Sequence, residues 1–261
     1  MNFAIAVLSW NSAHFLSSLL QSIWAHTPTP YRLLVVDNGS SDDSVQEAKR
    51  WRGVEVLELP YNTGVSGGRN AALDYFGKSP PDWLCFLDAD TVVPDRWDKR
   101  LLEHTRRKGV GVIGAVTGGS SAHHRVSVEP PNGADIPALN AFARSWASSH
   151  NGEWFDTEAV WGFCYLIRWG VVARIGGFDT SFGRYGCEDD DFAWRARLAG
   201  FKTGVALDTY VHHWGGHGLS QLPPTEAPEA WCRFLAKWHL PADLSHTQYV
   251  ALKHHHHLNP I

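Results

Sequence analysis

Several features of common protein classes are missing from this 261-residue sequence. No run approaches the roughly 18 consecutive apolar residues needed to span a bilayer, and the first eight residues contain no basic region typical of a secretory signal. The formal net charge is only −4, which argues against nucleic acid as the main partner. These absences predict a cytoplasmic protein. Peripheral contact with the inner face of a membrane is left open.

Cysteine is scarce as well. The four cysteines, at positions 85, 164, 187 and 232, fit no zinc-binding spacing, and the histidines lack ligand spacing with them. This pattern excludes a zinc protein of the usual kinds and is typical of a reducing compartment. Hydrophobic residues nevertheless make up 44% of the chain, and 13 tryptophans predict a sizeable core with aromatic-lined clefts.

The first 116 residues alternate between apolar runs and amphipathic segments. We expect strands at 3–8, 33–36, 54–59, 82–87 and 110–116, and helices at about 12–25, 42–51, 69–76 and 94–108. Fully apolar strands between such helices indicate a parallel sheet covered on both faces. Ligands of such sheets bind beyond the carboxyl ends of the strands, where Trp10, Asp37 and Asp88 all fall.

The pattern becomes irregular after Val116. Residues 117–160 are rich in Gly, Ser, Pro, Asn and His, and further on we expect helices at 137–148, 189–199 and 228–238 and strands at 163–168 and 203–207. Internal repeats and a clear linker are both missing. We therefore expect one α/β domain over residues 1–222, divided into halves at 1–116 and 117–222, followed by a C-terminal tail over 223–261.

Asp88-Ala89-Asp90 ends the apolar run at 83–87. Two carboxylates at a strand end can bind a divalent cation such as Mg²⁺ or Mn²⁺, which keeps positions open for phosphate oxygens. An ordinary turn or helix N-cap would also use these residues. Asp37, at the end of another strand, could accept a hydrogen bond from a nucleobase, or could serve only its turn.

Residues 62–70 read Asn-Thr-Gly-Val-Ser-Gly-Gly-Arg-Asn. Glycines at a helix start let backbone N–H groups approach a phosphate, and Arg69 could add a charged donor, although a plain tight turn remains an alternative. The segment lacks the Gly-Lys-Ser/Thr ending of a P-loop. A G-x-G-x-x-G match at 109–114 lies inside a strand rather than between a strand and a helix, so a dinucleotide-binding dehydrogenase is rejected.

A second acidic cluster, Glu188-Asp189-Asp190-Asp191, opens the predicted helix at 189–199. Acidic residues stabilise a helix N-terminus, and Asp191 and Arg195 are spaced to form a surface pair, so a structural role is a serious alternative. Crowded carboxylates also raise one another's pKa, which suits a general base. Further on, His212 and His213 should point to opposite faces of a strand, so at most one of them faces the Asp88–Asp90 site.

Together these segments resemble the family 2 glycosyltransferases, over roughly residues 3–220. The resemblance rests on the order and spacing of several segments: Ser9-Trp10-Asn11, Val36 to Ser40, Asn62-Thr63-Gly64, Gly68-Arg69-Asn70, Leu87 to Asp90, Gly176 to Asp179, Glu188-Asp189 and His213 to Gly216. It implies the GT-A fold, a Rossmann-like and mostly parallel sheet flanked by helices. It also implies that residues 1–116 are the donor half and 117–222 the acceptor half.

The resemblance further implies a role for each matched position. Asp189 would be the catalytic base, with Glu188 beside it and Asp191 as the alternative. Asp88, Asp90 and His213, or His212 in its place, would hold Mn²⁺ or Mg²⁺. The nucleotide-sugar donor, carrying UDP, GDP or dTDP, would be bound by residues of the donor half: Ser9, Asn11, Asp37, Asn62, Gly64, Arg69 and Asp88.

The expected reaction transfers a single sugar to an acceptor hydroxyl, with inversion. A glycan or glycolipid is the expected acceptor because Trp146, Trp154 and Trp161 lie in the acceptor half, although all three could be core residues. Two alternatives remain. A sugar-phosphate nucleotidyltransferase would need a basic Gly-rich loop after the first strand, which Leu8 to Ser12 does not supply. A non-catalytic nucleotide-sugar-binding module would not need Asp189.

Overall fold

The computed structural model describes residues 1–118, 124, 126 and 128–249; the last part of the predicted tail, with the histidines at 254–257, lies outside this range. Within the described residues the central sheet contains the strands β1 (Phe3–Ser9), β2 (Tyr31–Asp37), β3 (Val54–Glu58), β4 (Trp83–Asp88), β6 (Val110–Val116), β7 (Trp154–Asp156), β8 (Cys164–Arg168) and β9 (Lys202–Tyr210). Their spatial order is β3-β2-β1-β4-β8-β6-β9-β7.

The first four strands of this sheet are parallel, as the alternating pattern predicts. β1 lies between β2 and β4, and β3 follows β2 at the edge. β8 then inserts antiparallel between β4 and β6, while β6 and β9 are parallel. The mostly parallel α/β sheet is therefore confirmed. Its antiparallel interruption brings the residues just before β8 next to the end of β4.

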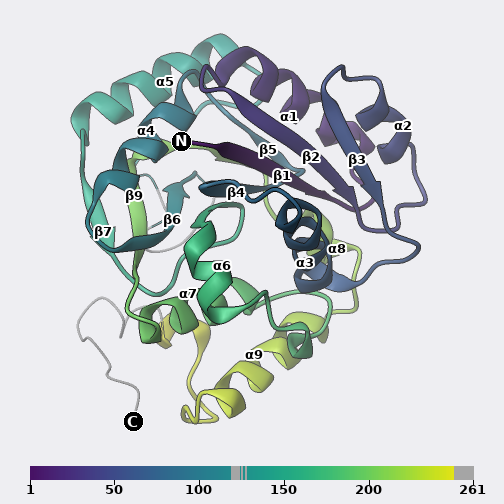
Figure 1. Ribbon diagram of the computed structural model, residues 1–261, viewed down its shortest axis with the longest axis vertical. Helices are drawn as coiled ribbons and strands as arrows, with labels where there is room; N and C mark the ends of the chain where they lie inside the picture. The colour runs from purple at the N-terminus through teal and green to yellow at the C-terminus, as the bar shows by residue number, and fades with distance from the viewer. Residues whose placement is uncertain (119–123, 125, 127, 250–261) are drawn as a thin grey trace.

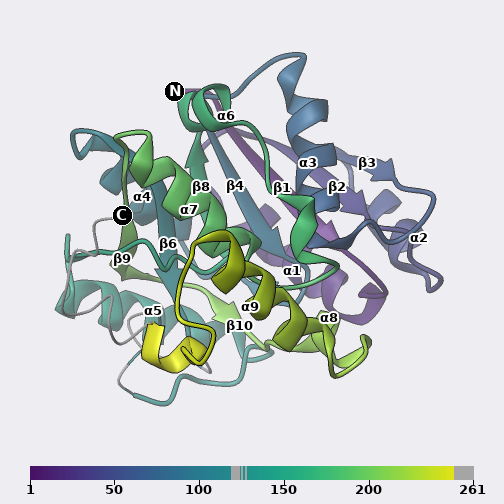
Figure 2. The same cartoon turned by 90° about the horizontal axis from the view of Figure 1, so that it is seen from below.

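Helices cover both faces of the sheet (Figures 1 and 2). One buried cluster joins the strands to Leu16 and Leu19 on one helix and Trp97 on another, and a second joins them to Ala72, Val171 and Phe192 on the opposite face. The helices are α1 (Ala13–His26), α2 (Ser44–Lys49), α3 (Gly64–Gly77), α4 (Trp97–Glu103), α5 (Ile136–Ser149), α6 (Trp169–Ile175), α7 (Glu188–Leu198), α8 (His217–Ser220) and α9 (Glu226–Lys237).

Two predicted helices have the wrong bounds. The helix expected from Arg69 begins at Gly64, because the Gly-rich segment forms its first turns; Gly68 packs so closely on Leu8 that a Cβ would overlap it. The helix expected at 94–108 is only Trp97–Glu103, since Arg96 has a left-handed φ of 59° before it and a 3₁₀ turn, His104–Arg106, follows it. The short elements β7, α6 and α8 were missed.

A small second sheet forms beside the end of β4. β5 (Thr91–Val92) pairs antiparallel with β10 (His212–His213), and in this register His213 lies opposite Thr91. The pairing joins two segments about 120 positions apart in the sequence and brings β10 to the Asp88–Asp90 turn.

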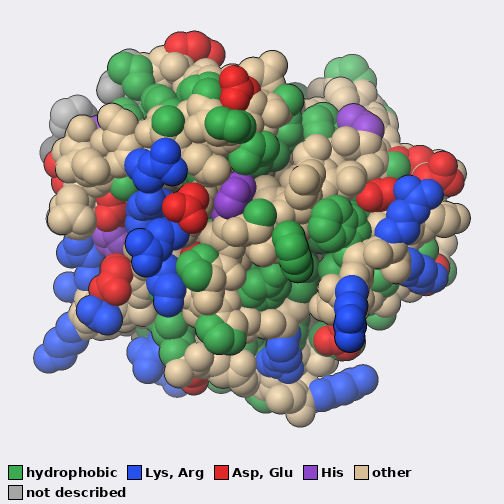
Figure 3. Space-filling view, turned by 90° about the horizontal axis from the view of Figure 1, so that it is seen from above, with side chains coloured by type: hydrophobic (Ala, Val, Ile, Leu, Met, Phe, Trp, Pro, Cys, Tyr) green, Lys and Arg blue, Asp and Glu red, His purple; other side chains and the backbone are tan. Residues whose placement is uncertain are grey.

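No helix among the described residues combines the length and the hydropathy needed to cross a bilayer. On the face seen from above, Lys and Arg side chains lie toward both sides, and hydrophobic side chains lie across the middle between them (Figure 3). This face is remote from α9, which lies on the lower side of the molecule in Figure 1.

Candidate active site

Asp88, Asp90 and His213 form a compact group at the carboxyl end of β4. One ligand atom from each side chain lies within 4.8 Å of the other two. His213 Nε2 is 3.3 Å from Asp90 Oδ1 and 4.0 Å from Asp88 Oδ2. The imidazole also stacks on Phe163, with ring centroids 5.0 Å apart, which fixes its orientation. The predicted Asp-x-Asp pair and one of the two predicted histidines thus lie together.

The electrostatics of this group suit a cation. Burial raises the pKa of Asp88 to about 6, only partly offset by Arg69 and His213. Burial lowers the pKa of His213, but its hydrogen bond to Asp90 and the two carboxylate charges outweigh burial, so the net shift is upward. Asp90 Oδ2 is buried and has no hydrogen-bond partner in the described part of the chain. Two carboxylates, one with an unpaired buried oxygen, and an imidazole have the ligand chemistry that suits a divalent ion.

His212 does not join this group. Its Nδ1 is 3.0 Å from the Tyr210 hydroxyl, its ring packs against Trp214, and burial lowers its pKa to about 4. Neighbouring residues of β10 point to opposite faces, which places the two imidazoles on different sides. The structure therefore favours His213 over the alternative His212.

A cleft at the strand ends includes Asp88, Asp90 and His213 in its wall; we call it the strand-end cleft. Trp10, Ser12 and Asn62 line it from the β1 and β3 sides, and Tyr185 and His217 line it from the opposite side.

The Asn62 carboxamide oxygen accepts a hydrogen bond from the backbone N–H of Gly64, at 2.8 Å. Gly64 needs its positive φ of 77°, and a Cβ there would overlap the backbone of Arg184.

Three other residues predicted to bind the nucleotide-sugar donor do not line this cleft. Ser9 is fully buried below Trp10. Asn11 has a left-handed φ of 49° and uses its side chain to hold the neighbouring loop, accepting from Ser41 N at 2.8 Å. Asp37 is 3% exposed; its Oδ2 accepts from Ser40 N, and its Oδ1 has no hydrogen-bond partner among the described residues.

Arg69 is only 2% exposed. Contrary to the prediction that it binds the donor, its guanidinium does not line the strand-end cleft. It donates to Glu188 Oε1 at 3.0 Å and lies 3.7 Å from Asp88 Oδ1. A second donor reaches the carbonyl oxygen of Gly162 at 3.0 Å. A helix turn carrying Arg at this position can therefore neutralise two carboxylates from separate elements, Asp88 on β4 and Glu188 on α7.

Glu188 and Asp189 begin α7 beside this arginine. Burial, followed by the charge of Asp189, raises the pKa of Glu188 to about 7. Asp189 Oδ2 accepts from the backbone N–H of Gly162 at 2.7 Å, and its Oδ1 accepts from Asp190 N at 2.9 Å. Asp189 is half-buried and lines a cavity that also contains Asp88 and His213. Its carboxylate is thus fixed in place and open to a ligand.

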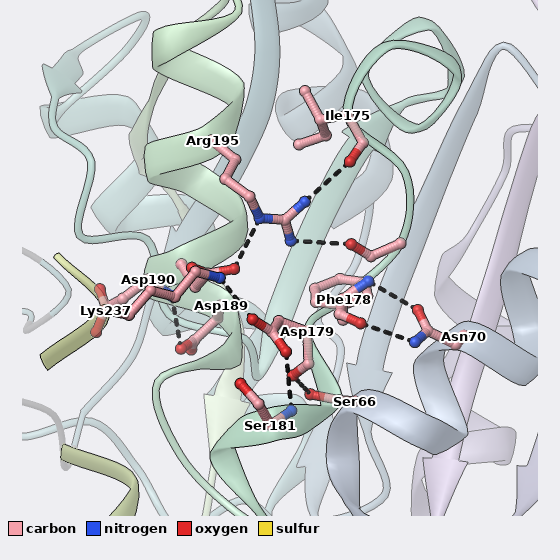
Figure 4. A network of polar contacts seen from close by, with 12 residues as sticks. Ser66, Asn70, Ile175, Phe178, Asp179, Ser181, Asp189, Asp190, Arg195 and Lys237 are labelled. Atoms are coloured by element: carbon pink, nitrogen blue, oxygen red, sulfur yellow. Dashed lines mark hydrogen bonds and ion pairs between the residues drawn. The ribbon is translucent and has the colours of Figure 1, made fainter. Parts of the chain in front are cut away.

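Asp191 occupies a different environment. It is fully buried and forms ion pairs with Arg195, at 2.7 Å, and Lys237, at 2.6 Å. Arg195 in turn donates to the carbonyl oxygens of Ile175 and Gly177 (Figure 4). The side chain of Asp191 therefore anchors α7 to its neighbours. This is the structural role weighed from the sequence, and the structure does not place Asp191 as an alternative base.

Some residues of the site were missed by sequence reasoning. Tyr185 lines both the strand-end cleft and the cavity beside Asp189, and Trp231 and His246 line the cavity from the C-terminal segment. Tyr185 sits between two glycines just before the acidic cluster, a weak signal that could have indicated a site loop. Trp231 and His246 offer no comparable signal, because they reach the site only through the packing of α9.

Comparison with known proteins agrees with this geometry. Residues 4–131, about half of the chain, match the family model described as Glycosyl transferase family 2. The N-acetylglucosaminyl-diphospho-decaprenol L-rhamnosyltransferase of Mycobacterium tuberculosis is 22% identical over 251 residues, which cover 84% of this chain and 78% of the relative. The UDP-Glc:alpha-D-GlcNAc-diphosphoundecaprenol beta-1,3-glucosyltransferase WfgD of Escherichia coli is 33% identical over 92 residues, covering 34% of this chain and 35% of WfgD.

A solved structure extends the likeness to the fold. The mannosyltransferase PcManGT from Pyrobaculum calidifontis, in complex with GDP-Man and Mn²⁺, has a TM-score of 0.62 at 17% identity, covering 96% of this chain and 78% of PcManGT. The chain therefore belongs to glycosyl transferase family 2, with a GT-A fold. It is an enzyme of the glycosyltransferase class, which sets aside the nucleotidyltransferase and the non-catalytic binding module.

Proposed function

We propose that this enzyme uses a divalent ion, held by Asp88, Asp90 and His213, to transfer one sugar from a nucleoside-diphosphate donor to an acceptor hydroxyl. The observation that carries the proposal is the convergence of these three ligands, within 4.8 Å of one another, on a cleft adjoining Asp189. An imidazole nitrogen beside two carboxylates favours Mn²⁺ over Mg²⁺, which prefers oxygen ligands alone. Bound there, the ion would offset the charge that grows on the leaving diphosphate.

The donor would lie in the strand-end cleft. Trp10 and Asn62 line this cleft and would contact the donor's nucleoside. Tyr185 lines both the cleft and the cavity beside Asp189 and would lie near the sugar. Asp37 has a buried oxygen without a hydrogen-bond partner among the described residues next to this cleft, and this oxygen could accept a hydrogen bond from an N–H group of the nucleobase. PcManGT binds GDP-Man and WfgD is named for UDP-Glc, so the nucleotide of the donor is left open as UDP, GDP or dTDP.

Asp189 would act as the general base. Its two oxygens are fixed by backbone N–H groups at 2.7 and 2.9 Å, so the carboxylate can take a proton from an acceptor hydroxyl without first reorienting. The oxygen of the acceptor hydroxyl would then attack C1 of the donor sugar from the side opposite the leaving nucleoside diphosphate. A single displacement of this kind inverts the anomeric centre. Glu188, paired with Arg69, would position Asp189 rather than exchange protons itself.

The acceptor is proposed to be a sugar carried on a polyprenol diphosphate. Both relatives, from Mycobacterium tuberculosis and Escherichia coli, are named for acceptors of this chemistry. A lipid-linked acceptor would bring the enzyme to the surface of a membrane, and peripheral binding at the inner face is the arrangement we propose.

Thermal unfolding with a panel of nucleoside diphosphates tests the proposal. A ligand at about 100 times its dissociation constant adds roughly 2.7 kcal/mol of stability. We expect one nucleotide to raise the melting temperature with Mn²⁺ and not with chelator, and Asp90→Asn to abolish the shift. A shift of equal size in chelator would refute the metal site, and no shift with any nucleotide would refute the donor site.

A further inference from the structure

A cavity of about 350 Å³ opens beside Asp189. We call it the aromatic cavity, because Trp161, Phe163, Tyr185 and Trp231 line it together with the carboxylates of Glu188, Asp189 and Asp190. It adjoins the strand-end cleft through Asp88 and His213, which line both. Its outer wall comes from the segment at 226–249, beyond the residues that the family model matches.

This segment is firmly attached to the rest of the enzyme. Lys237 of α9 forms ion pairs of 2.6 Å with both Asp179 and Asp191 (Figure 4). Phe234 and Tyr249 are buried against Phe182 and Trp194. In Figure 2, α9 crosses the lower side of the molecule close to α7 and α8. The outer wall of the aromatic cavity is therefore a fixed part of the site.

Two tryptophans of the cavity are held in defined orientations. Trp231 donates from Nε1 to the carbonyl oxygen of Leu244 at 2.8 Å and stacks on Phe234 with centroids 5.2 Å apart. Trp161 stacks on His124 at 5.3 Å with an interplanar angle of 13°. Rigid aromatic rings of this kind present apolar surface at little cost in conformational entropy.

A polar group lies between these rings. The imidazole of His246 is 5.1 Å from the ring of Trp231 and 6.4 Å from that of Trp161. Its Nε2 is 3.6 Å from Asp190 Oδ2, and its side chain is 43% exposed. The interaction with Asp190 raises the pKa of His246, so both ring nitrogens keep their protons up to a higher pH than in a free imidazole. Flat apolar walls with a few fixed donors and acceptors match the two kinds of surface on a pyranose ring.

We propose that Trp161, Trp231 and His246 form the subsite for the acceptor sugar, which binds a pyranose ring with one hydroxyl directed to Asp189. This inference rests on the proposed function and adds the residues that select the acceptor. The C–H faces of the ring pack on the tryptophans, and His246 and the carboxylates bind its hydroxyls. The sugar is recognised in the same way whether it is free or linked to a lipid diphosphate.

Binding of two probes tests the subsite by titration calorimetry in the presence of Mn²⁺. The first is methyl N-acetylglucosaminide, and the second is N-acetylglucosaminyl diphosphate on a short farnesyl chain. The variants are Trp231→Ala and His246→Ala. The control is Trp24→Ala, which removes a tryptophan that is 73% exposed and lies outside the cavity. We expect the wild type and the control to bind both probes equally, and each cavity variant to bind both at least tenfold more weakly.

Three results would overturn the proposal: neither probe binds the wild type, both variants bind like the wild type, or only the diphosphate probe is weakened. The last would mean that the cavity recognises phosphate. If Trp231→Ala lowers the melting temperature, the result for His246→Ala decides whether the subsite exists, because the His246 side chain is more exposed. Stabilisation by nucleotide, measured in parallel, separates the donor site from the acceptor subsite. If no nucleotide stabilises the wild type, the donor site is refuted, and the binding of the two probes still tests the acceptor subsite.

Discussion

Arg69 and Asp189 are bound by the same residue, Gly162. The guanidinium of Arg69 donates to the carbonyl oxygen of Gly162 at 3.0 Å, and the N–H of Gly162 donates to Asp189 Oδ2 at 2.7 Å. Arg69 also pairs with Glu188 and approaches Asp88. One buried arginine thus connects a proposed metal ligand, the proposed base and the backbone between them.

Gly162→Ala is expected to disturb this connection directly. A Cβ at position 162 would overlap the guanidinium of Arg69, and overpacking of this kind costs about 1–3 kcal/mol. We expect a lower free energy of unfolding in denaturant and a lower kcat, because the N–H that holds Asp189 must move.

Gly170→Ala is the matched control for this substitution. The nearest atom to a Cβ at Gly170 is 3.9 Å away, and alanine is favoured over glycine in a helix such as α6. We expect this control to be as stable as the wild type or up to about 1 kcal/mol more stable. Equal denaturation midpoints for the two alanine variants would contradict the close contact at Gly162.

Arg69→Met is expected to destabilise the fold much more than loss of a surface arginine. It leaves Glu188 buried without its partner, and removing one member of a buried ion pair costs about 3–5 kcal/mol. Arg50→Met, which breaks an ion pair in which Arg50 is 74% exposed, should cost less than about 1 kcal/mol. Denaturant unfolding of both variants gives the comparison, and similar losses would mean that the buried network contributes no more than a surface pair.

The sequence predicted the parts of the site that lie at strand ends. Apolar runs ending in Asp37 and Asp88 define strands, and parallel strands bring their carboxyl ends to one edge. Alternation along a strand also predicted that at most one of His212 and His213 faces the Asp88–Asp90 site. Which one it is depends on the pairing of β10 with β5, a contact between distant segments that no local pattern contains.

Other features depend on tertiary contacts in the same way. Asp191 looks like its acidic neighbours in the sequence, but it is buried against Lys237, which is 46 positions away. Arg69 looked like a phosphate ligand because local patterns do not show that α7 packs over it. Trp231 and His246 reach the aromatic cavity only because the C-terminal segment packs against α7, where Lys237 pairs with Asp191. The antiparallel insertion of β8 equally lacks a signature in its own five residues.

Asp189→Asn should abolish most activity and leave the fold intact. The amide keeps the size of the side chain but cannot take a proton, and a general base contributes about 10²–10⁴-fold to the rate. We expect kcat to fall by at least about 100-fold with nucleotide binding unchanged. Asp191→Asn is the control: it should lower the melting temperature, because Asp191 is buried between two cations, and retain kcat within a few-fold. The reverse pattern would make Asp191 the base.

His213→Ala and His212→Ala separate the two histidines. His213 lies 3.3 Å from Asp90 Oδ1, whereas His212 contacts Tyr210 and Trp214. We therefore expect His213→Ala to weaken Mn²⁺ binding by at least tenfold and His212→Ala to leave it within twofold. Electron paramagnetic resonance of free Mn²⁺ during titration of the nucleotide-bound protein measures both affinities directly. Equal losses of Mn²⁺ affinity in the two variants would show that His213 is not a metal ligand.

Stability should fall as the pH rises through the titration of Glu188. Burial raises the pKa of Glu188 from 4.5 to about 7, so between these values the folded protein holds a proton that the unfolded chain has released. The free energy of unfolding therefore declines over this window, by up to about 1.4 kcal/mol for each unit of pKa difference. Glu188→Gln stays neutral and can still accept from Arg69, so its stability relative to the wild type should rise between pH 5 and pH 7. Denaturant unfolding at several pH values gives these differences, and parallel pH profiles for the wild type and Glu188→Gln would show that Glu188 titrates normally.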